Sequence, residues 1–405
     1  MIKSLKATLS IIMLTSSVIA QSGCTDPLAD NYNASATVND GSCTYQKTQQ
    51  VYSPIGSISG YLGESSGLTF SDGFIWSHND SGNPNKFFKI NPQNGSVIQR
   101  LTVVNAANND WEDITHDDEY IYIGDFGNND GDRQNLKILK ISKAQFINNS
   151  SVEVDVVAEE IRFSYADQSN FQSRKNHDFD CEALISVGDS LFIFTKNRAN
   201  ARTKVYHLPK DTGSYAVNPV EEYNVDGLIT GAAYDSASGT IALIGYQQSH
   251  YNGFIWYLYD YQGTQFFSGN KRRVDIGNGT TDWQTEGIAY ADSSKIFVSN
   301  ENSYIVATLF SSNPLSDLQP LSISLEKTGQ ISIYPNPVSD VLHLECPSII
   351  KTLTITDINS HCIFESEVNS KTLDIQWNKL SASSGIYFLT LQTETETLVQ
   401  KIIAQ

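Results

Sequence analysis

Three glutamates in this sequence share one local pattern. Glu112, Glu182 and Glu286 each follow a short polar stretch, and each begins an apolar segment. Carboxylate oxygens are the ligands that Ca²⁺ prefers. Carboxylates that are brought together repel one another unless a cation or hydrogen bonds neutralise them. The pattern therefore predicts either a cation site or a set of hydrogen bonds to backbone N–H groups, and the residues alone leave both open.

The apolar segments after these glutamates belong to a longer repeat. Short apolar runs bounded by Gly, Asn and Asp, together with abundant Tyr and Phe, indicate an all-β protein. Five units share a first strand at 66–69, 112–115, 182–185, 230–233 and 286–289, and a second at 74–76, 120–123, 191–194, 241–244 and 296–298. A third strand is visible at 86–90, 136–140 and 204–208.

Repeated units that each contain several short strands are typical of the blades of a β-propeller. We place the propeller at residues 52–324 and favour six blades, with five or seven as alternatives. The long interval between the first and second glutamates, Glu112 and Glu182, holds either a sixth blade or an insertion around residues 152–176. The first strand of each blade lines the central channel, so Glu112, Glu182 and Glu286 are expected to form a ring with Ser66 and Thr230.

Other polar residues near the expected channel are weaker candidates. Asp125 and Asn300 follow second strands and could add oxygen ligands to a calcium ion. Trp111 and Trp283 lie beside ring glutamates, where they could stack on a ligand or simply pack. The sequence contains no nucleophile elbow, His-Glu-x-x-His, P-loop or Cys-x-x-Cys motif. Catalytic residues are therefore unknown, with His78 as a weak candidate.

The Glu286-Gly287-Ile288 strand is similar to strands of known propellers. The region resembles six-bladed calcium-dependent propellers of the lactonase and paraoxonase type, and phytase-like esterase domains. The resemblance implies a channel calcium that polarises an ester or lactone and coordinates a water. The three ring glutamates would be its ligands, and His78 or His177 would be the general base.

The N-terminal residues 1–20 read as a signal peptide, with Lys3 and Lys6 before an apolar core and Ala20 at the cleavage site. The mature chain is expected to begin near Gln21; a lipidated Cys24 is the alternative. In an exported chain, Cys24 and Cys43 are expected to form a disulfide, worth roughly 3 kcal/mol for a loop of this length. Cys346 and Cys362 could pair as well, which leaves Cys181 buried.

The segment between Cys24 and Cys43 belongs to the predicted region 21–51, and a linker to the propeller is predicted at 46–53. Its acidic and amide side chains could bind calcium or form turns, and turns are favoured. These side chains are Asp26, Asp30, Asn31, Asn33, Asn39 and Asp40. The segment resembles a cysteine-bracketed repeat of secreted and surface proteins from Bacteroidetes-type bacteria, which implies a location and not a reaction.

The final segment, 325–405, contains Tyr334-Pro335-Asn336-Pro337, then Gly385-Ile386-Tyr387 and an ending with Lys401-Ile402. Alternating strands run between these motifs. The segment resembles the C-terminal sorting domain of the type IX secretion system. This implies a small β-sandwich that the export machinery recognises, and an extracellular or cell-surface destination after passage through the periplasm. An ordinary immunoglobulin-like domain is the alternative.

The charge of the chain restricts its partners. A formal net charge of −18 disfavours nucleic acid, which would repel the chain, and no segment after the signal peptide is long and apolar enough to span a membrane. Two function classes remain. One is a ligand-binding or interaction propeller with a channel cation, and the other is a calcium-dependent hydrolase of esters, lactones or phosphoesters.

Overall fold

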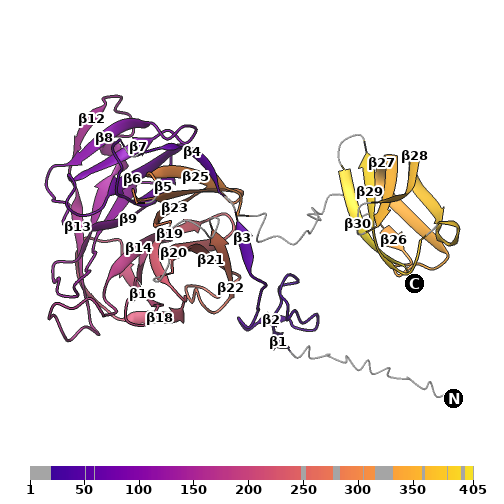
Figure 1. Ribbon diagram of the computed structural model, residues 1–405, viewed down its shortest axis with the longest axis horizontal. Helices are drawn as coiled ribbons and strands as arrows, with labels where there is room; N and C mark the ends of the chain where they lie inside the picture. Colours follow the sequence, from indigo (N-terminus) through magenta and orange to yellow (C-terminus); the bar gives the residue numbers. More distant parts are fainter. Residues whose placement is uncertain are drawn as a thin grey trace, which may run out of the picture. The chain divides into compact units, whose positions relative to one another are not determined.

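The computed structural model describes residues 20–404 except 51, 59, 248–251, 277–282, 304, 315–331, 358–360, 381 and 394–396. The predicted signal peptide therefore lies, apart from its last residue, outside the described residues. Two compact units divide the chain between residues 318 and 319. Figure 1 draws both units, and each is described here by itself.

Five sheets arranged as blades make up most of the first unit (Figure 1). Their innermost strands adjoin one another in a closed ring, β5–β9–β14–β19–β23. From the innermost strand outwards, blade 1 contains β5 (Ser65–Ser71), β6 (Phe74–Asn79), β7 (Lys86–Ile90), β8 (Val97–Val103) and β12 (Glu153–Val156), and blade 2 contains β9 (Trp111–His116), β10 (Tyr120–Asp125), β11 (Lys137–Ser142), β13 (Glu159–Tyr165) and β17 (Gly213–Val217). Blade 3 contains β14 (Cys181–Val187), β15 (Ser190–Thr195), β16 (Arg202–Pro209) and β18 (Pro219–Asn224). Blade 4 contains β19 (Leu228–Asp235), β20 (Thr240–Tyr246), β21 (Gly253–Tyr259), β22 (Asn270–Ile276) and β3 (Thr48–Gln50), and blade 5 contains β23 (Thr285–Asp292), β24 (Lys295–Asn300), β25 (Thr308–Ser312) and β4 (Ser53–Ser57).

The described residues form five blades, so the preference for six was wrong. All five predicted first and second strands are present, but the long interval after β11 does not form a blade of its own. After the short 3₁₀ helix η1 (Lys143–Gln145), the interval supplies β12 to blade 1 and β13 to blade 2. Residues 166–180 then reach β14 without a further strand.

Three blades are completed by a strand from elsewhere in the chain. β12 runs parallel to β8, β17 parallel to β13, and β3 parallel to β22. The ring itself is closed by β4, which pairs with β25 of the last blade. The linker predicted at 46–53 is therefore wrong in part, because β3 and the first residue of β4 fall within it.

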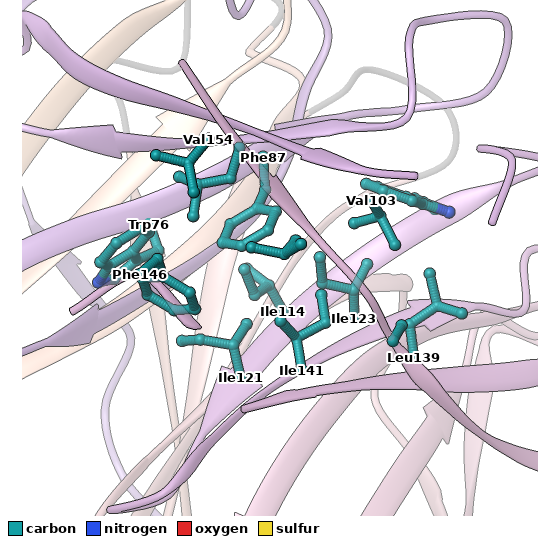
Figure 2. Close-up of a cluster of buried hydrophobic side chains, with 14 residues drawn as sticks. Trp76, Phe87, Val103, Ile114, Ile121, Ile123, Leu139, Ile141, Phe146 and Val154 are labelled. Carbon is teal, nitrogen blue, oxygen red and sulfur yellow. The ribbon is translucent and has the colours of Figure 1, made fainter. Parts of the chain in front are cut away.

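The core lies between neighbouring blades, and side-chain alternation along each strand explains it. In β10, Ile121 and Ile123 pack toward blade 1, whereas Tyr122 packs toward blade 3. Figure 2 shows the first of these clusters, where Trp76 of blade 1 and Phe146 have ring centroids 5.1 Å apart. Each fully buried side chain of this kind contributes about 1.5–3 kcal/mol.

The N-terminal segment is a small module with β1 (Ser22–Gly23), β2 (Val38–Asn39) and the predicted disulfide between Cys24 and Cys43. The bonded Cys24 thiol excludes the lipidated alternative. Asp26 accepts hydrogen bonds from the Leu28 N–H (2.9 Å) and from the hydroxyl of Tyr259 in blade 4 (2.7 Å). The module's Asp and Asn side chains thus form the favoured turns. Asp26 and Asn39 also fix the module to the propeller, since Asn39 Nδ2 donates to Asp260 Oδ2 (3.0 Å) and Asn270 Oδ1 (2.9 Å).

The second unit contains β26 (Ser332–Tyr334), β27 (Val341–Asp357), β28 (Cys362–Gln376), η2 (Trp377–Lys379), β29 (Gly385–Thr393) and β30 (Thr397–Ala404). The long β27 pairs with β26, β28 and β29 and bends around a core that includes Leu353 and Trp377. Cys346 is buried, Cys362 is exposed and both are free, so the pairing considered for them does not occur.

Candidate functional site

Each innermost strand has a register irregularity close to its first residues. In β9, Trp111 pairs with Asp125 and Asp113 pairs with Gly124, so Glu112 has no cross-strand partner. Such bulges turn a side chain out of the regular alternation. The positions skipped in the other four strands include Ser66, Glu182, Thr230 and Glu286. The five predicted ring positions therefore all lie at bulges.

The ring glutamates share one pocket of about 260 Å³ at a mouth of the channel. Its lining is drawn from all five blades and from the loops after their second strands. The lining residues are Ser66, Asp80, Glu112, Asn129, Glu182, Lys196, Arg198, Tyr246, Gln284, Glu286 and Glu301. The structure thus brings Glu112, Glu182 and Glu286 together, as the repeat predicted.

The two hydroxyl-bearing ring residues fasten neighbouring blades. Ser66 Oγ donates to the Glu112 carbonyl oxygen (2.6 Å), which joins blade 1 to blade 2. Thr230 Oγ1 donates to the Thr285 carbonyl oxygen (2.7 Å), which joins blade 4 to blade 5. The interlocking role that the sequence left open for the glutamates is thus performed by these hydroxyls.

Glu182 has cationic partners. Lys196 Nζ lies 3.0 Å from Glu182 Oε2, and Arg198 Nη2 lies 4.0 Å from Glu182 Oε1. Burial raises the pKa of Glu182 above its usual range, and the nearby Lys196 opposes this by favouring the ionised carboxylate. Burial alone would lower the pKa of Lys196, but the Glu182 carboxylate raises it well above its usual range. Blade 3 thus presents a buried ion pair to the pocket.

Glu112 and Glu286 differ from Glu182. Their exposed fractions are only 3% and 4%, and neither carboxylate forms a hydrogen bond or ion pair with another described residue. Burial, reinforced by neighbouring carboxylates, raises the pKa of each well above its usual range. These two side chains therefore have unused capacity to bind a cation or a hydrogen-bond donor.

Asp80, Asp110 and Glu112 form a compact oxygen cluster beside the pocket. One carboxylate oxygen from each lies within 4.8 Å of the others. Calcium binds oxygens at about 2.4 Å, so two ligands of one ion lie at most about 4.8 Å apart. The spacing and the all-oxygen donor set therefore fit calcium. Burial, with repulsion from Asp80, raises the pKa of Asp110 to about 6.

Gly127 leaves the room that this cluster needs. A Cβ atom at Gly127 would lie 2.0 Å from Glu112 Oε1 and 2.6 Å from Asp110 Oδ2. Any side chain there would displace both carboxylates. Arg133 Nη1 lies 3.8 Å from Asp110 Oδ2 and gives partial compensation from outside the pocket.

The two weaker ligand candidates, Asp125 and Asn300, form hydrogen bonds with neighbouring residues of their own blades. Asp125 accepts hydrogen bonds from Asn109 Nδ2 (2.8 Å) and Arg133 Nη2 (2.9 Å). Asn300 donates to the Glu301 carbonyl (2.7 Å) and accepts from the Thr308 N–H (3.1 Å). Neither side chain lines the pocket.

The histidine and tryptophan candidates also lie outside the pocket lining. His78 is fully buried with its ring edge-on to Trp111 (5.7 Å between centroids), and burial lowers its pKa to about 4. His177 accepts from the Phe179 N–H (3.1 Å), and its Nε2 donates to the Asn129 carbonyl (3.2 Å). Trp283 is packed among the aromatic rings of blade 5.

Lys196 and Arg198 of the pocket lining, and Asp110 of the oxygen cluster beside it, had no role assigned from the sequence. Asp80 and Glu301 lie in loops after second strands, the kind of position from which Asp125 and Asn300 were expected to add ligands. A signal for the last two exists, because Asn79-Asp80 and Asn300-Glu301 both end a second strand with the same Asn–acid pair. Burial and repulsion from Asp80 raise the pKa of Glu301 to about 7.

Asp113 is the residue after Glu112, and its side chain is fully buried. Its Oδ1 accepts from the Ile114 N–H (2.8 Å), and its Oδ2 accepts from the N–H groups of Leu184 (2.7 Å) and Ala232 (3.2 Å). A Cβ atom at Gly67 would lie 2.7 Å from the Asp113 Cα, so the strands approach too closely for a larger residue. Asp113 thus joins the inner strands of blades 2, 3 and 4.

The comparisons with known proteins concern the two units separately. Residues 332–405 match the family model of the secretion system C-terminal sorting domain, which confirms the predicted type IX sorting domain. A search of curated proteins gives no match to this sequence. In the described residues, no helix is long and apolar enough to cross a membrane.

Solved structures with low similarity to this chain include three from bacteria. PorZ of Porphyromonas gingivalis, a surface component of the type IX secretion system, is 11% identical over 84% of this chain and 45% of its own, with a TM-score of 0.34. PQQ-bound aldose sugar dehydrogenase of Streptomyces coelicolor is 12% identical over 65% and 97%, with a TM-score of 0.40. The calcium-binding protein regucalcin of Agrobacterium tumefaciens is 11% identical over 66% and 95%, with a TM-score of 0.36.

The chain therefore spans less than half the length of PorZ. At these TM-scores the similarities carry no argument about function, and the propeller assignment rests on the strand pairing described above.

Proposed function

We propose that the protein binds a small ligand in the acidic pocket of its propeller, together with a calcium ion held by Asp80, Asp110 and Glu112. The sorting domain implies export to the cell surface or the extracellular space. We further propose that the chain reaches that destination through the periplasm, after removal of the signal peptide. One observation carries the binding proposal. The buried carboxylates of Glu112 and Glu286 face a shared pocket without a partner among the described residues.

The cation set differs from the one expected from the sequence. Glu112 is kept, whereas Glu182 is neutralised by Lys196 and Glu286 lies outside the compact oxygen cluster. A bound calcium would offset the repulsion among the three carboxylates and leave positions open toward the pocket. Because Gly127 has no side chain, the carboxylates of Asp110 and Glu112 can occupy the positions described above.

Calorimetric titration of chelator-treated full-length protein with Ca²⁺ tests the cation site. Wild type is expected to bind one ion with high occupancy, and Glu112→Gln to weaken binding by at least about tenfold. Glu221→Gln is the matched control, because Glu221 is a half-buried glutamate outside the pocket lining. Equal affinities in wild type and Glu112→Gln would refute the site.

A glycine pair gives a second test that leaves every carboxylate intact. Gly127→Ala is expected to reduce calcium affinity, because its methyl group would overlap the positions of Glu112 Oε1 and Asp110 Oδ2. Gly60→Ala serves as the control, since nothing lies within 4 Å of a Cβ atom there. If both variants bind calcium with the affinity of the wild type, the space left by Gly127 is not required for the calcium site.

A calcium-dependent hydrolase is the second candidate. The observation in its favour is the pKa of Glu301, raised to about 7 by burial, which suits a group that exchanges protons near neutral pH. Assays of ester, lactone and phosphoester hydrolysis, with and without chelator, test it. Hydrolysis that needs calcium and is lost in Glu301→Gln supports the enzyme. Calcium binding without any hydrolysis argues against it.

A further inference from the structure

The size and lining of the pocket restrict its ligand. A volume of about 260 Å³ corresponds to roughly nine water molecules at about 30 Å³ each, and is smaller than a typical drug-sized site. All eleven lining residues carry a polar side chain, and Tyr246 alone has an aromatic ring. An apolar ligand would gain little here. The pocket suits a small molecule that is polar over most of its surface.

The pocket offers acceptors and donors from different blades. Glu286 and Glu301 belong to blade 5 or the loop after its second strand, and their carboxylates can only accept when ionised. Lys196 and Arg198 follow the second strand of blade 3, and their charged groups can only donate. A ligand that fills the pocket therefore needs groups that both donate and accept.

The charges disfavour two ligand classes. The lining contains five carboxylates and two cationic side chains, a formal charge of −3 that a bound calcium ion reduces to −1. A phosphate or carboxylate ligand would add negative charge and bring few donors for the pocket acids. A small organic cation would satisfy the carboxylates, but it would be repelled by Lys196 and Arg198 and would leave their donors unmatched. A neutral ligand rich in hydroxyl groups avoids both penalties, because each hydroxyl donates one hydrogen bond and accepts others.

We infer that the pocket binds a small neutral polyhydroxylated ligand, of the monosaccharide or polyol class. Its hydroxyl groups donate to Glu286 and Glu301 and accept from Lys196. One or two further hydroxyls complete the coordination of the calcium ion at Asp80, Asp110 and Glu112. This inference rests on the proposed function, since the ligand and the cation share one pocket.

Binding of neutral sugars by the calcium-loaded full-length protein tests this inference. The probes are glucose, galactose, mannose, xylose, arabinose and mannitol, with ethanolamine as the cationic comparison and inorganic phosphate as the anionic one. Calorimetry is expected to detect one bound molecule of at least one neutral probe. Its affinity should fall by at least about tenfold in Glu286→Gln, which loses a charged acceptor, and stay unchanged in Glu221→Gln.

Calcium affinity, measured in the same samples, separates this inference from the proposed function. Glu286→Gln should bind calcium like wild type, because Glu286 is outside the oxygen cluster. If calcium binds but no neutral probe does, or if ethanolamine or phosphate binds more tightly than every sugar, the ligand assignment is overturned and the cation site stands. If wild type binds no calcium, the cation site itself fails, whatever the sugars do.

Discussion

Asp113 is the residue at which three blades meet. It belongs to blade 2, and its carboxylate accepts N–H groups from its own strand and from the inner strands of blades 3 and 4. Burial raises its pKa well above the usual range, against the three hydrogen bonds, which lower it. The residue therefore loses hydration and in exchange holds the inner strands of three blades together.

Asp113→Ala is expected to destabilise the propeller by about 2–5 kcal/mol, because three buried N–H groups lose their acceptor. Urea unfolding followed by tryptophan fluorescence measures the change. Asp118→Ala, at an exposed position of the same blade, provides the baseline. A midpoint for Asp113→Ala equal to that of Asp118→Ala would show that water or a shifted backbone replaces the carboxylate at no cost.

The pocket acids predict an unusual pH dependence. The pKa of Glu301 is raised to about 7 in the folded protein from an ordinary value near 4.5. A group of this kind contributes stability that is fully present below its unfolded pKa and is lost as the pH rises through its folded pKa. Calcium-free protein is therefore expected to have a higher melting temperature at about pH 5 than at about pH 8.

Scanning calorimetry in the presence of chelator measures this difference. Glu301→Gln should reduce it, because glutamine does not titrate, and calcium should restore stability at the higher pH by binding the ionised pocket. A melting temperature that rises steadily from pH 5 to pH 8 in chelator would contradict the assignment of raised pKa values to these acids.

At the residue scale, the sequence predicted the acids that recur and missed those that do not. Glu112, Glu182 and Glu286 were found because each repeats at the start of an inner strand. Lys196 and Arg198 have no counterpart of the same charge in the other blades, so a search for repeats passes over them. That Lys196 Nζ lies 3.0 Å from Glu182 Oε2 and supplies its counter-charge depends on a distance that only the fold supplies.

At the scale of elements, strand alternation was sufficient to predict every inner and second strand. It could not predict the blade count, because β12, β17 and β3 complete sheets to which the neighbouring sequence does not belong. Because β12 and β13 lie between β9 and β14, the interval between these two inner strands is nearly as long as two repeats. The bulges were also hidden, since a single skipped residue leaves the apolar alternation on either side intact.

The strands β3 and β4 predict how much of the N-terminus the propeller needs. A variant that lacks residues 20–46 loses the disulfide module but keeps both strands, and is expected to unfold cooperatively. A variant that lacks residues 20–58 removes the closing strand of blade 5 and the last strand of blade 4, which exposes two sheet edges.

Circular dichroism during heating, together with light scattering, compares the two deletions. The longer deletion is expected to aggregate or to lose its cooperative transition. Were both deletions to melt like the full chain, the pairing of β4 with β25 would not be what closes the ring.

At the scale of the whole molecule, the two units carry separate information. The sorting domain specifies export and the propeller carries the pocket, and the compact units divide between them. The last segment stood apart in the sequence because its Tyr-Pro-Asn-Pro, Gly-Ile-Tyr and Lys-Ile motifs follow one another within 325–405. The ligand was not predictable, because it depends on five blades converging on one small volume.

Removal of residues 332–405 is expected to abolish appearance of the protein outside the cell and to leave the propeller folded. Immunoblotting of culture medium, surface and periplasmic fractions from a host with type IX secretion measures the first effect. Calcium titration of the purified shortened chain measures the second. Full secretion of the shortened chain would mean that another segment directs export.

The exchange of parallel strands between blades has a consequence for how this gene can change. A propeller whose blades are self-contained can gain or lose one by duplication or deletion of a single repeat. In this chain, such an event would separate β12 or β17 from the sheet it completes and leave an orphan strand beside an open edge. The number of blades is therefore expected to be fixed across its descendants, while the loops around the pocket remain free to diverge.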